Sequence, residues 1–142
     1  MYPQLKELHS IFAYLVLALL LLAIFLNTYT RSRKMPFGKT NKIVALLGLI
    51  STHVQLMFAI VLYFLSPLGF SNFSGAAMKD AVSRLYVLEH PLMMILAIEL
   101  ITIGYMKGSR AVEDNSKYKN IVVFYSIGLI VILSRLPWAT WL

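Results

Sequence analysis

Three histidines, all within or beside apolar segments, are the residues of this sequence best suited to chemistry. His9 opens the first apolar run, His53 lies in the middle of the second, and His90 lies just inside the third, within Glu89-His90-Pro91. A neutral imidazole is a common metal ligand and can also carry protons. Because a polar ring in hydrocarbon is costly unless it is neutral and partnered, histidines at such positions predict a functional site.

The composition predicts that this site lies in an integral membrane protein. Of the 142 residues, 59% are hydrophobic and only 13% are charged, whereas roughly 25% are charged in ordinary globular proteins. The sequence contains no cysteine, which excludes disulfides, c-type haem attachment and cysteine-ligated clusters. The net charge of +7 comes from basic residues in short loops, so membrane topology explains it better than nucleic-acid binding.

The apolar runs predict an all-α integral membrane protein with a single domain of four spans. A chain of this length has room for about four helices of about 20 residues each. Short connections favour an up-down-up-down four-helix transmembrane bundle. The expected spans are about 8–26, 43–65, 85–105 and 121–136.

The basic residues predict the orientation of this bundle. Of the 13 lysines and arginines, five follow the first span and four follow the third. By the positive-inside rule these two loops are cytoplasmic, and both termini lie on the outer, periplasmic side of a bacterial inner membrane.

The depth of the histidines favours one pair. Counted at ~1.5 Å per residue, His53 lies near the bilayer centre, while His9 and His90 lie in the outer half on spans one and three. Two imidazoles on facing helices are what a six-coordinate b-type haem needs, which predicts His9 and His90 as its iron ligands. Arg84 and Arg135, near the outer rim, would pair with the haem propionates. Snorkelling to lipid headgroups would otherwise explain both arginines.

Each histidine also has a structural explanation. His9 would serve as a polar residue at the membrane interface, and His90 as a hydrogen-bond partner of a neighbouring helix. His53 is open between four roles: a core hydrogen bond, an alternative ligand opposite His90, the ligand of a second haem, and a quinone pocket shared with Gln55. Glu99 lies nine residues after His90, on the opposite face of its helix, and therefore outside the same site.

These residues resemble those of a known group of proteins. Small four-helix bacterial membrane proteins of the cytochrome b-like type have a similar pattern, and the resemblance covers nearly the whole chain. It rests on Leu8-His9-Ser10, Thr52-His53-Val54-Gln55 and Glu89-His90-Pro91.

A looser resemblance is to one half of haem A synthase. It rests on His9, on Gln55 with Ala59, and on Arg84-Leu85 ahead of His90, and it implies that His9 and His90 are the axial pair. The chain departs from that family in the position of Glu7, in the absence of an arginine after His9 and in its half-length bundle. The resemblance therefore implies haem binding and not synthase chemistry.

The leading functional prediction is a membrane cytochrome with one haem b that transfers electrons, in exchange with quinone or with a partner on the outer face. Such a chain is an electron-transfer protein or subunit more than a stand-alone enzyme. One rival is a cofactor-free accessory or structural subunit of a larger membrane complex, respiratory or other. A weaker rival is a proton-conducting or transport protein that uses His53 and Glu99.

Overall fold

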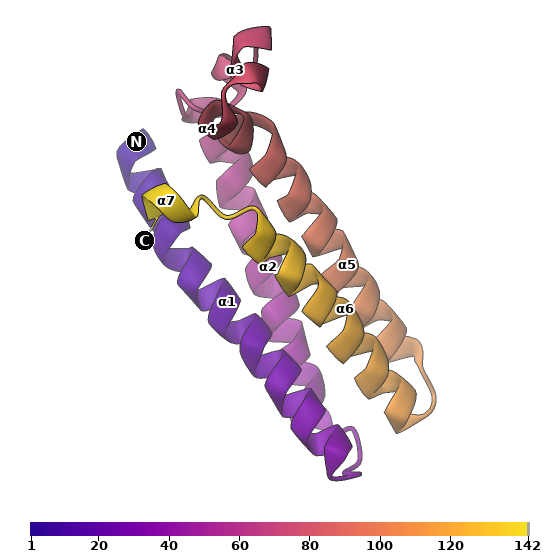
Figure 1. Cartoon of the computed structure of the whole chain (residues 1–142). Helices are drawn as coiled ribbons and strands as arrows, with labels where there is room; N and C mark the ends of the chain where they lie inside the picture. Colours follow the sequence, from indigo (N-terminus) through magenta and orange to yellow (C-terminus); the bar gives the residue numbers. More distant parts are fainter. Residues whose placement is uncertain (142) are drawn as a thin grey trace.

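The computed structural model describes residues 1–141, and its regular elements are all helical (Figure 1). Within these residues there is no β-strand. The long helices are α1 (Tyr2–Ser32), α2 (Lys39–Leu65), α5 (His90–Arg110) and α6 (Asp114–Ser134). The short elements are η1 (Phe70–Asn72), α3 (Gly75–Lys79), α4 (Ala81–Arg84), η2 (Leu85–Glu89) and α7 (Trp138–Trp141).

Four helices are long and apolar enough to cross a membrane, which indicates a multi-pass membrane protein. They are Tyr2–Ser32, Lys39–Leu65, Ala81–Arg110 and Asp114–Ser134. The predicted apolar spans lie within or largely within these helices, but the helices extend further, because backbone hydrogen bonding continues into the polar flanks where apolar composition ends. The four-helix expectation is confirmed at this level.

The first helix ends in a Schellman motif without glycine. The N–H of Lys34 donates to the carbonyl of Arg31, and the N–H of Met35 donates to the carbonyl of Thr30. Lys34 takes the left-handed conformation, with φ of 54°, that this motif requires. The basic segment after α1 is therefore an ordered turn.

The four long helices pack so that α1 and α5 lie diagonally across the bundle. Helix α1 contacts α2 and α6, and α5 contacts the same two helices. The α5–α6 contact is close because glycines line it: a Cβ atom on Gly104 would lie 2.5 Å from Phe124 Cβ, and one on Gly128 would lie 2.7 Å from an Ile101 side-chain atom. Small residues permit such close approach of membrane helices.

Polar contacts bring together the end of α1, the loop that follows it and the start of α6. Arg31 Nε donates to Asn115 Oδ1 over 3.0 Å. The Tyr118 hydroxyl donates to the carbonyls of Met35 and Pro36, over 3.0 and 3.1 Å. Both basic loops therefore lie at the same end of the molecule, at the bottom of Figure 1.

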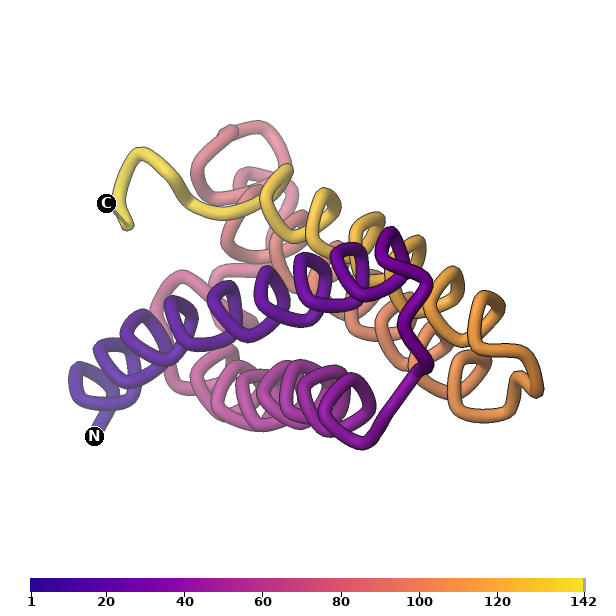
Figure 2. Tube along the Cα trace, turned by 90° about the horizontal axis from the view of Figure 1, so that it is seen from below, coloured from indigo at the N-terminus to yellow at the C-terminus, as the bar shows by residue number. Residues whose placement is uncertain are grey.

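The C-terminal segment turns back over the first turns of α1. The ring of Trp141 stacks on that of Tyr14, with centroids 4.7 Å apart, and the Thr140 hydroxyl hydrogen-bonds that of Tyr86. Figure 2 shows this segment leaving the end of α6 and running beside the N-terminal part of the bundle. It helps enclose the space between α1 and α5.

A π-helical turn, η2, leads into His90. The N–H of His90 donates to the carbonyl of Leu85, five residues back, and Pro91 follows at once. Proline has no N–H to donate to the carbonyl four residues before it, which here is Val87. The hydroxyl of Tyr63 on α2 donates to that carbonyl instead, over 2.7 Å. Such turns are frequent at functional sites, and this one fixes how His90 enters the bundle.

Candidate functional site

A cavity of about 610 Å³ lies between α1, α2, α5 and the C-terminal segment. Its volume falls within the range of roughly 300–1,000 Å³ typical of small-molecule and cofactor sites. The wall is mostly aliphatic and aromatic, with polar side chains spread among these residues. Those polar side chains include Lys6, His9, Gln55, Tyr63 and His90.

His9 and His90 face one another across this cavity. Their ring centroids are 6.5 Å apart and their planes are at 90°. His9 comes from α1 and His90 from α5, the two diagonal helices, so the rings meet inside the bundle. This placement agrees with the expectation that spans one and three bring the two histidines together.

The hydrogen bonding of His90 leaves one ring nitrogen available to a ligand. Nδ1 of His90 lies 2.8 Å from the carbonyl oxygen of Arg135. Because a carbonyl only accepts, Nδ1 carries the hydrogen, and in the neutral ring Nε2 has the free lone pair. Metal-binding histidines typically donate their other N–H to a carbonyl in this way.

His9 is linked to Gln55 on α2. The side-chain amide of Gln55 donates to the His9 backbone carbonyl over 2.8 Å. His9 Nδ1 and Gln55 Oε1 are both buried without a hydrogen-bond partner within the described residues. Gln55 thus belongs with His9. It lines a different cavity from His53, which weighs against one of the four roles considered for His53, a quinone pocket shared with Gln55.

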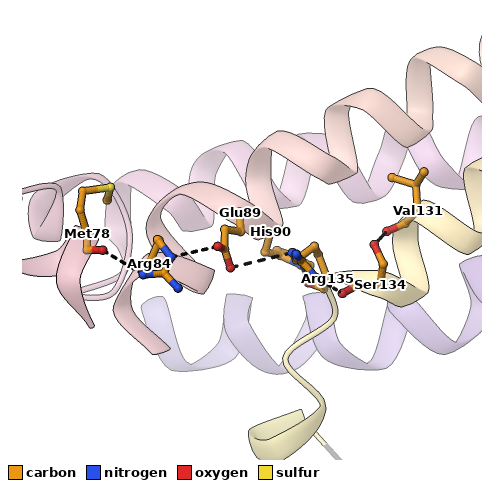
Figure 3. Close-up of polar contacts among 7 residues, drawn as sticks. All are labelled: Met78, Arg84, Glu89, His90, Val131, Ser134 and Arg135. Atoms are coloured by element: carbon orange, nitrogen blue, oxygen red, sulfur yellow. Dashed lines mark hydrogen bonds and ion pairs between the residues drawn. The ribbon is translucent and has the colours of Figure 1, made fainter. Parts of the chain in front are cut away.

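The two arginines predicted near the site both reach Glu89. Arg84 Nε lies 3.0 Å from one carboxylate oxygen of Glu89, and Arg135 Nε lies 3.9 Å from the other. Arg84 also donates to the Met78 carbonyl over 2.9 Å. Figure 3 shows this chain of contacts beside His90. Neither arginine lines the cavity. Both side chains instead pair with the Glu89 carboxylate, next to the predicted ligand His90.

His53 lies apart from the other two histidines. It lines a second cavity of about 440 Å³, between α2 and α5, together with Glu99 and Thr102. Both His53 and Glu99 are exposed on the outside of the bundle. Glu99 lines this second cavity and not the cavity that His90 lines, which agrees with the prediction that it lies outside the site of His90.

Asp80 begins the helical segment that carries Arg84. Its carboxylate accepts the backbone N–H of Ser83 over 3.1 Å and so N-caps α4. Hydrogen bonds from the Ser83 side chain and backbone hold the pKa of Asp80 below its ordinary value. The charged form of Asp80 thus helps to order the approach to η2.

The two histidines are the donors that could hold a cofactor at this site. Residues 1–141 contain no group of three or more histidine, cysteine, aspartate or glutamate side chains arranged around a common metal position. A haem requires only two axial ligands, because the porphyrin supplies the other four nitrogens, and His9 and His90 are two such groups.

Comparisons with protein-family models, with curated protein sequences and with solved structures find no match to this chain. The resemblances to cytochrome b-like proteins and to haem A synthase therefore stay predictions. The candidate site rests on the geometry of the chain itself.

Sequence reasoning missed three residues around the site. Lys6 lies one helical turn before His9 and lines the cavity, so the spacing of three residues could have identified it. Glu89 was missed because neighbouring residues on a helix point in different directions, so its position beside His90 in the sequence does not predict its contacts. Tyr63 was missed because nothing local predicts that it replaces the donor lost at Pro91.

Proposed function

We propose that this chain is a membrane b-type cytochrome that holds one haem b between α1 and α5, with His9 and His90 as iron ligands. The observation that carries the proposal is the separation of 6.5 Å between the two ring centroids. Two metal–imidazole bonds of about 2.0 Å, each extended by roughly 1.2 Å from nitrogen to ring centre, would place the centroids about 6.4 Å apart. The rings are thus spaced for one iron between them.

The surroundings support the same assignment. Arg135 fixes the tautomer of His90 through its carbonyl, which leaves Nε2 facing away from that bond. The apolar wall would bury the macrocycle and exclude water. Lys6 at the cavity supplies a positive charge for a propionate, while Arg84 and Arg135, which pair with Glu89, lie outside the cavity lining.

A haem with two histidine ligands supplies one-electron redox chemistry and has no open position for a substrate. The chain would therefore serve electron transfer and not bond chemistry. His9 and His90 would hold the cofactor, and the apolar wall would exclude water from it. Electron exchange with a quinone or with a partner complex follows as the role of such a protein.

We further propose an up-down-up-down topology in a bacterial inner membrane, with both termini on the periplasmic side. The two basic loops lie together at one end of the bundle, and the positive-inside rule assigns that end to the cytoplasm. The cavity between His9 and His90 then lies in the outer half of the bilayer.

The deciding experiment is a dithionite-reduced minus oxidised visible spectrum of the detergent-purified protein, with pyridine haemochrome quantitation against protein. We expect about one haem b per chain. About two would bring His53 in as a further ligand. Folded protein without haem, made with ample haem supply, would overturn the proposal and favour a cofactor-free accessory subunit.

A further inference from the structure

The second cavity, a groove on the outside of the bundle, contains two exposed ionisable side chains. His53 lies near the middle of α2 and Glu99 near the middle of α5, and both are exposed. They line one groove of about 440 Å³ together with Thr102 and aliphatic residues. Ionisable groups at this depth are costly in contact with lipid alone, which indicates a polar ligand between them.

His53 is prepared to accept a hydrogen. Its Nδ1 lies 2.9 Å from the carbonyl oxygen of Leu49, one turn back on the same helix. The carbonyl can only accept, so Nδ1 is the donor and the neutral ring keeps the lone pair on Nε2. That nitrogen is available to a hydroxyl group in the groove.

Glu99 supplies a second acceptor. Among residues 1–141, its carboxyl takes part in no ion pair, since the two ion pairs there both involve Glu89. The nearby Thr102 hydroxyl donates to the Ile98 carbonyl over 2.7 Å and so offers only an acceptor to a ligand. The groove therefore matches a ligand that carries hydroxyl hydrogens and reaches it through the bilayer.

The groove also adjoins the cavity of His9 and His90. Leu56, Ile95 and Ile98 line both cavities. A single layer of side chains thus separates a ligand in the groove from a cofactor held between the two histidines. No channel or moving part is needed for an electron to pass between them.

We propose that the groove of His53 and Glu99 binds the headgroup of a lipid-soluble quinol. One quinol hydroxyl donates to His53 Nε2 and the other to the Glu99 carboxylate, while the isoprenoid tail stays in the lipid. The proposal rests on the proposed function for its electron acceptor, which is the ferric haem at His9 and His90.

The reaction balances as the oxidation of one quinol to one quinone. Both O–H bonds break, one proton passes to His53 Nε2 and the other to the Glu99 carboxylate. The two electrons leave one at a time, each to a ferric haem iron, and each is then passed to a one-electron acceptor protein at the outer surface. The quinone, which no longer has hydroxyl hydrogens to donate, leaves to the bilayer.

Binding is tested without reliance on redox activity by photolabelling the purified full chain in lipid nanodiscs with an azido derivative of a short-tailed quinone. We expect the label on α2 and α5 around His53 and Glu99, displaced by excess unlabelled short-tailed quinone. Glu99→Leu and His53→Leu, which each remove one acceptor, should each lower the affinity about tenfold, the effect of losing one strong hydrogen bond. Met57→Leu is the matched control, because Met57 is exposed on α2 and lines neither cavity.

A second readout separates this proposal from the proposed function. Glu99→Leu and His53→Leu should keep the wild-type haem content, while haem reduction by a short-tailed quinol slows about tenfold. Labelling of the groove in a protein that binds no haem would support the site and refute the haem proposal. Labelling elsewhere, labelling unchanged in both variants, or a dimer that covers α2 and α5 in place of quinone would overturn the site.

Discussion

The side-chain amide of Gln55 donates a hydrogen bond to the backbone carbonyl of His9 over 2.8 Å, so the middle of α2 holds the first turns of α1 in register. The same amide leaves its oxygen buried without a partner, and His9 Nδ1 is buried without one as well. Gln55 Oε1 is an acceptor without a donor, and His9 Nδ1 can be a donor without an acceptor, so the two atoms could satisfy one another. If His9 binds iron through Nε2, Nδ1 keeps its hydrogen and Gln55 Oε1 is its available acceptor.

We therefore expect substitutions of Gln55 to act on His9. Gln55→Leu should lower the free energy of unfolding by about 1 kcal/mol through the lost hydrogen bond. Gln55→Glu should lower the haem midpoint potential, because a carboxylate beside the imidazole favours the more positive ferric state. Denaturation in detergent measures the stability of Gln55→Leu, and redox titration measures the midpoint potential of Gln55→Glu, each against wild type. An unchanged potential in Gln55→Glu would exclude Gln55 as the partner of His9.

Replacement of each histidine should show which of the three bind the haem iron. His9→Ala and His90→Ala should each lose most of the haem, because each removes one axial ligand. His53→Ala should keep about one haem per chain, since His53 lines the other cavity. The pyridine haemochrome assay measures all three, with helical circular dichroism as the control for folding. Haem retained without His90 would contradict the assignment.

The sequence predicts the four helices well, because each span is an apolar run of sufficient length. The helix ends are less predictable, since hydrogen bonding carries α1 to Ser32 and a left-handed Lys34 ends it without the glycine that usually marks such a stop. The meeting of His9 and His90 was predictable from depth and chain order alone.

Other parts of the site depend on rotation about the helix axes, which depth does not give. The π-helical turn before His90 changes the direction of the residues that precede it, so the sequence did not predict the contacts of Glu89 with both arginines. Likewise, the pairing of Gln55 with His9 and of His53 with Glu99 depends on which side of α2 faces α1 and which faces α5.

The hydrogen bond from Tyr63 to the Val87 carbonyl should stabilise η2 only because Pro91 is present. We expect Tyr63→Phe to lower the free energy of unfolding by about 1–2 kcal/mol, since it leaves a carbonyl without a donor. In a Pro91→Ala background the alanine N–H can serve that carbonyl, so the same substitution should cost less. A double-mutant cycle from denaturation in detergent gives the coupling. Equal costs in both backgrounds would show that Tyr63 does not replace the missing donor.

The N-cap at Asp80 should make the order of α4 depend on pH. The folded pKa of Asp80 is held below its ordinary value by Ser83, so the stabilisation is present above that ordinary value and is lost as the pH falls through the folded pKa. Asp80→Ala should therefore expose the Ser83 amide to hydrogen exchange at neutral pH. Asp80→Asn, which keeps an acceptor, is the control. The difference in the exchange rate of the Ser83 amide between Asp80→Ala and wild type should become smaller in acid. A difference in rate that does not depend on pH would contradict the assignment of Asp80 as the N-cap.

Glu89, which lies between Arg84 and Arg135, should tune the potential of a haem at His90. Glu89→Gln removes a negative charge next to the ligand, so it should raise the midpoint potential. The Arg135 contact is long and the groups are about a third to a half exposed, so we expect only about 20 to 40 mV, equivalent to an ion pair of about 0.5 to 1 kcal/mol. Glu7→Gln is the matched control, because Glu7 is exposed on α1 and does not line the cavity. Arg135→Gln should keep the haem, since it retains the backbone carbonyl that accepts from His90, and should lower the midpoint potential, because it removes a positive charge near the ligand. A shift of equal size in Glu7→Gln would show that Glu89 acts only through the net charge of the protein.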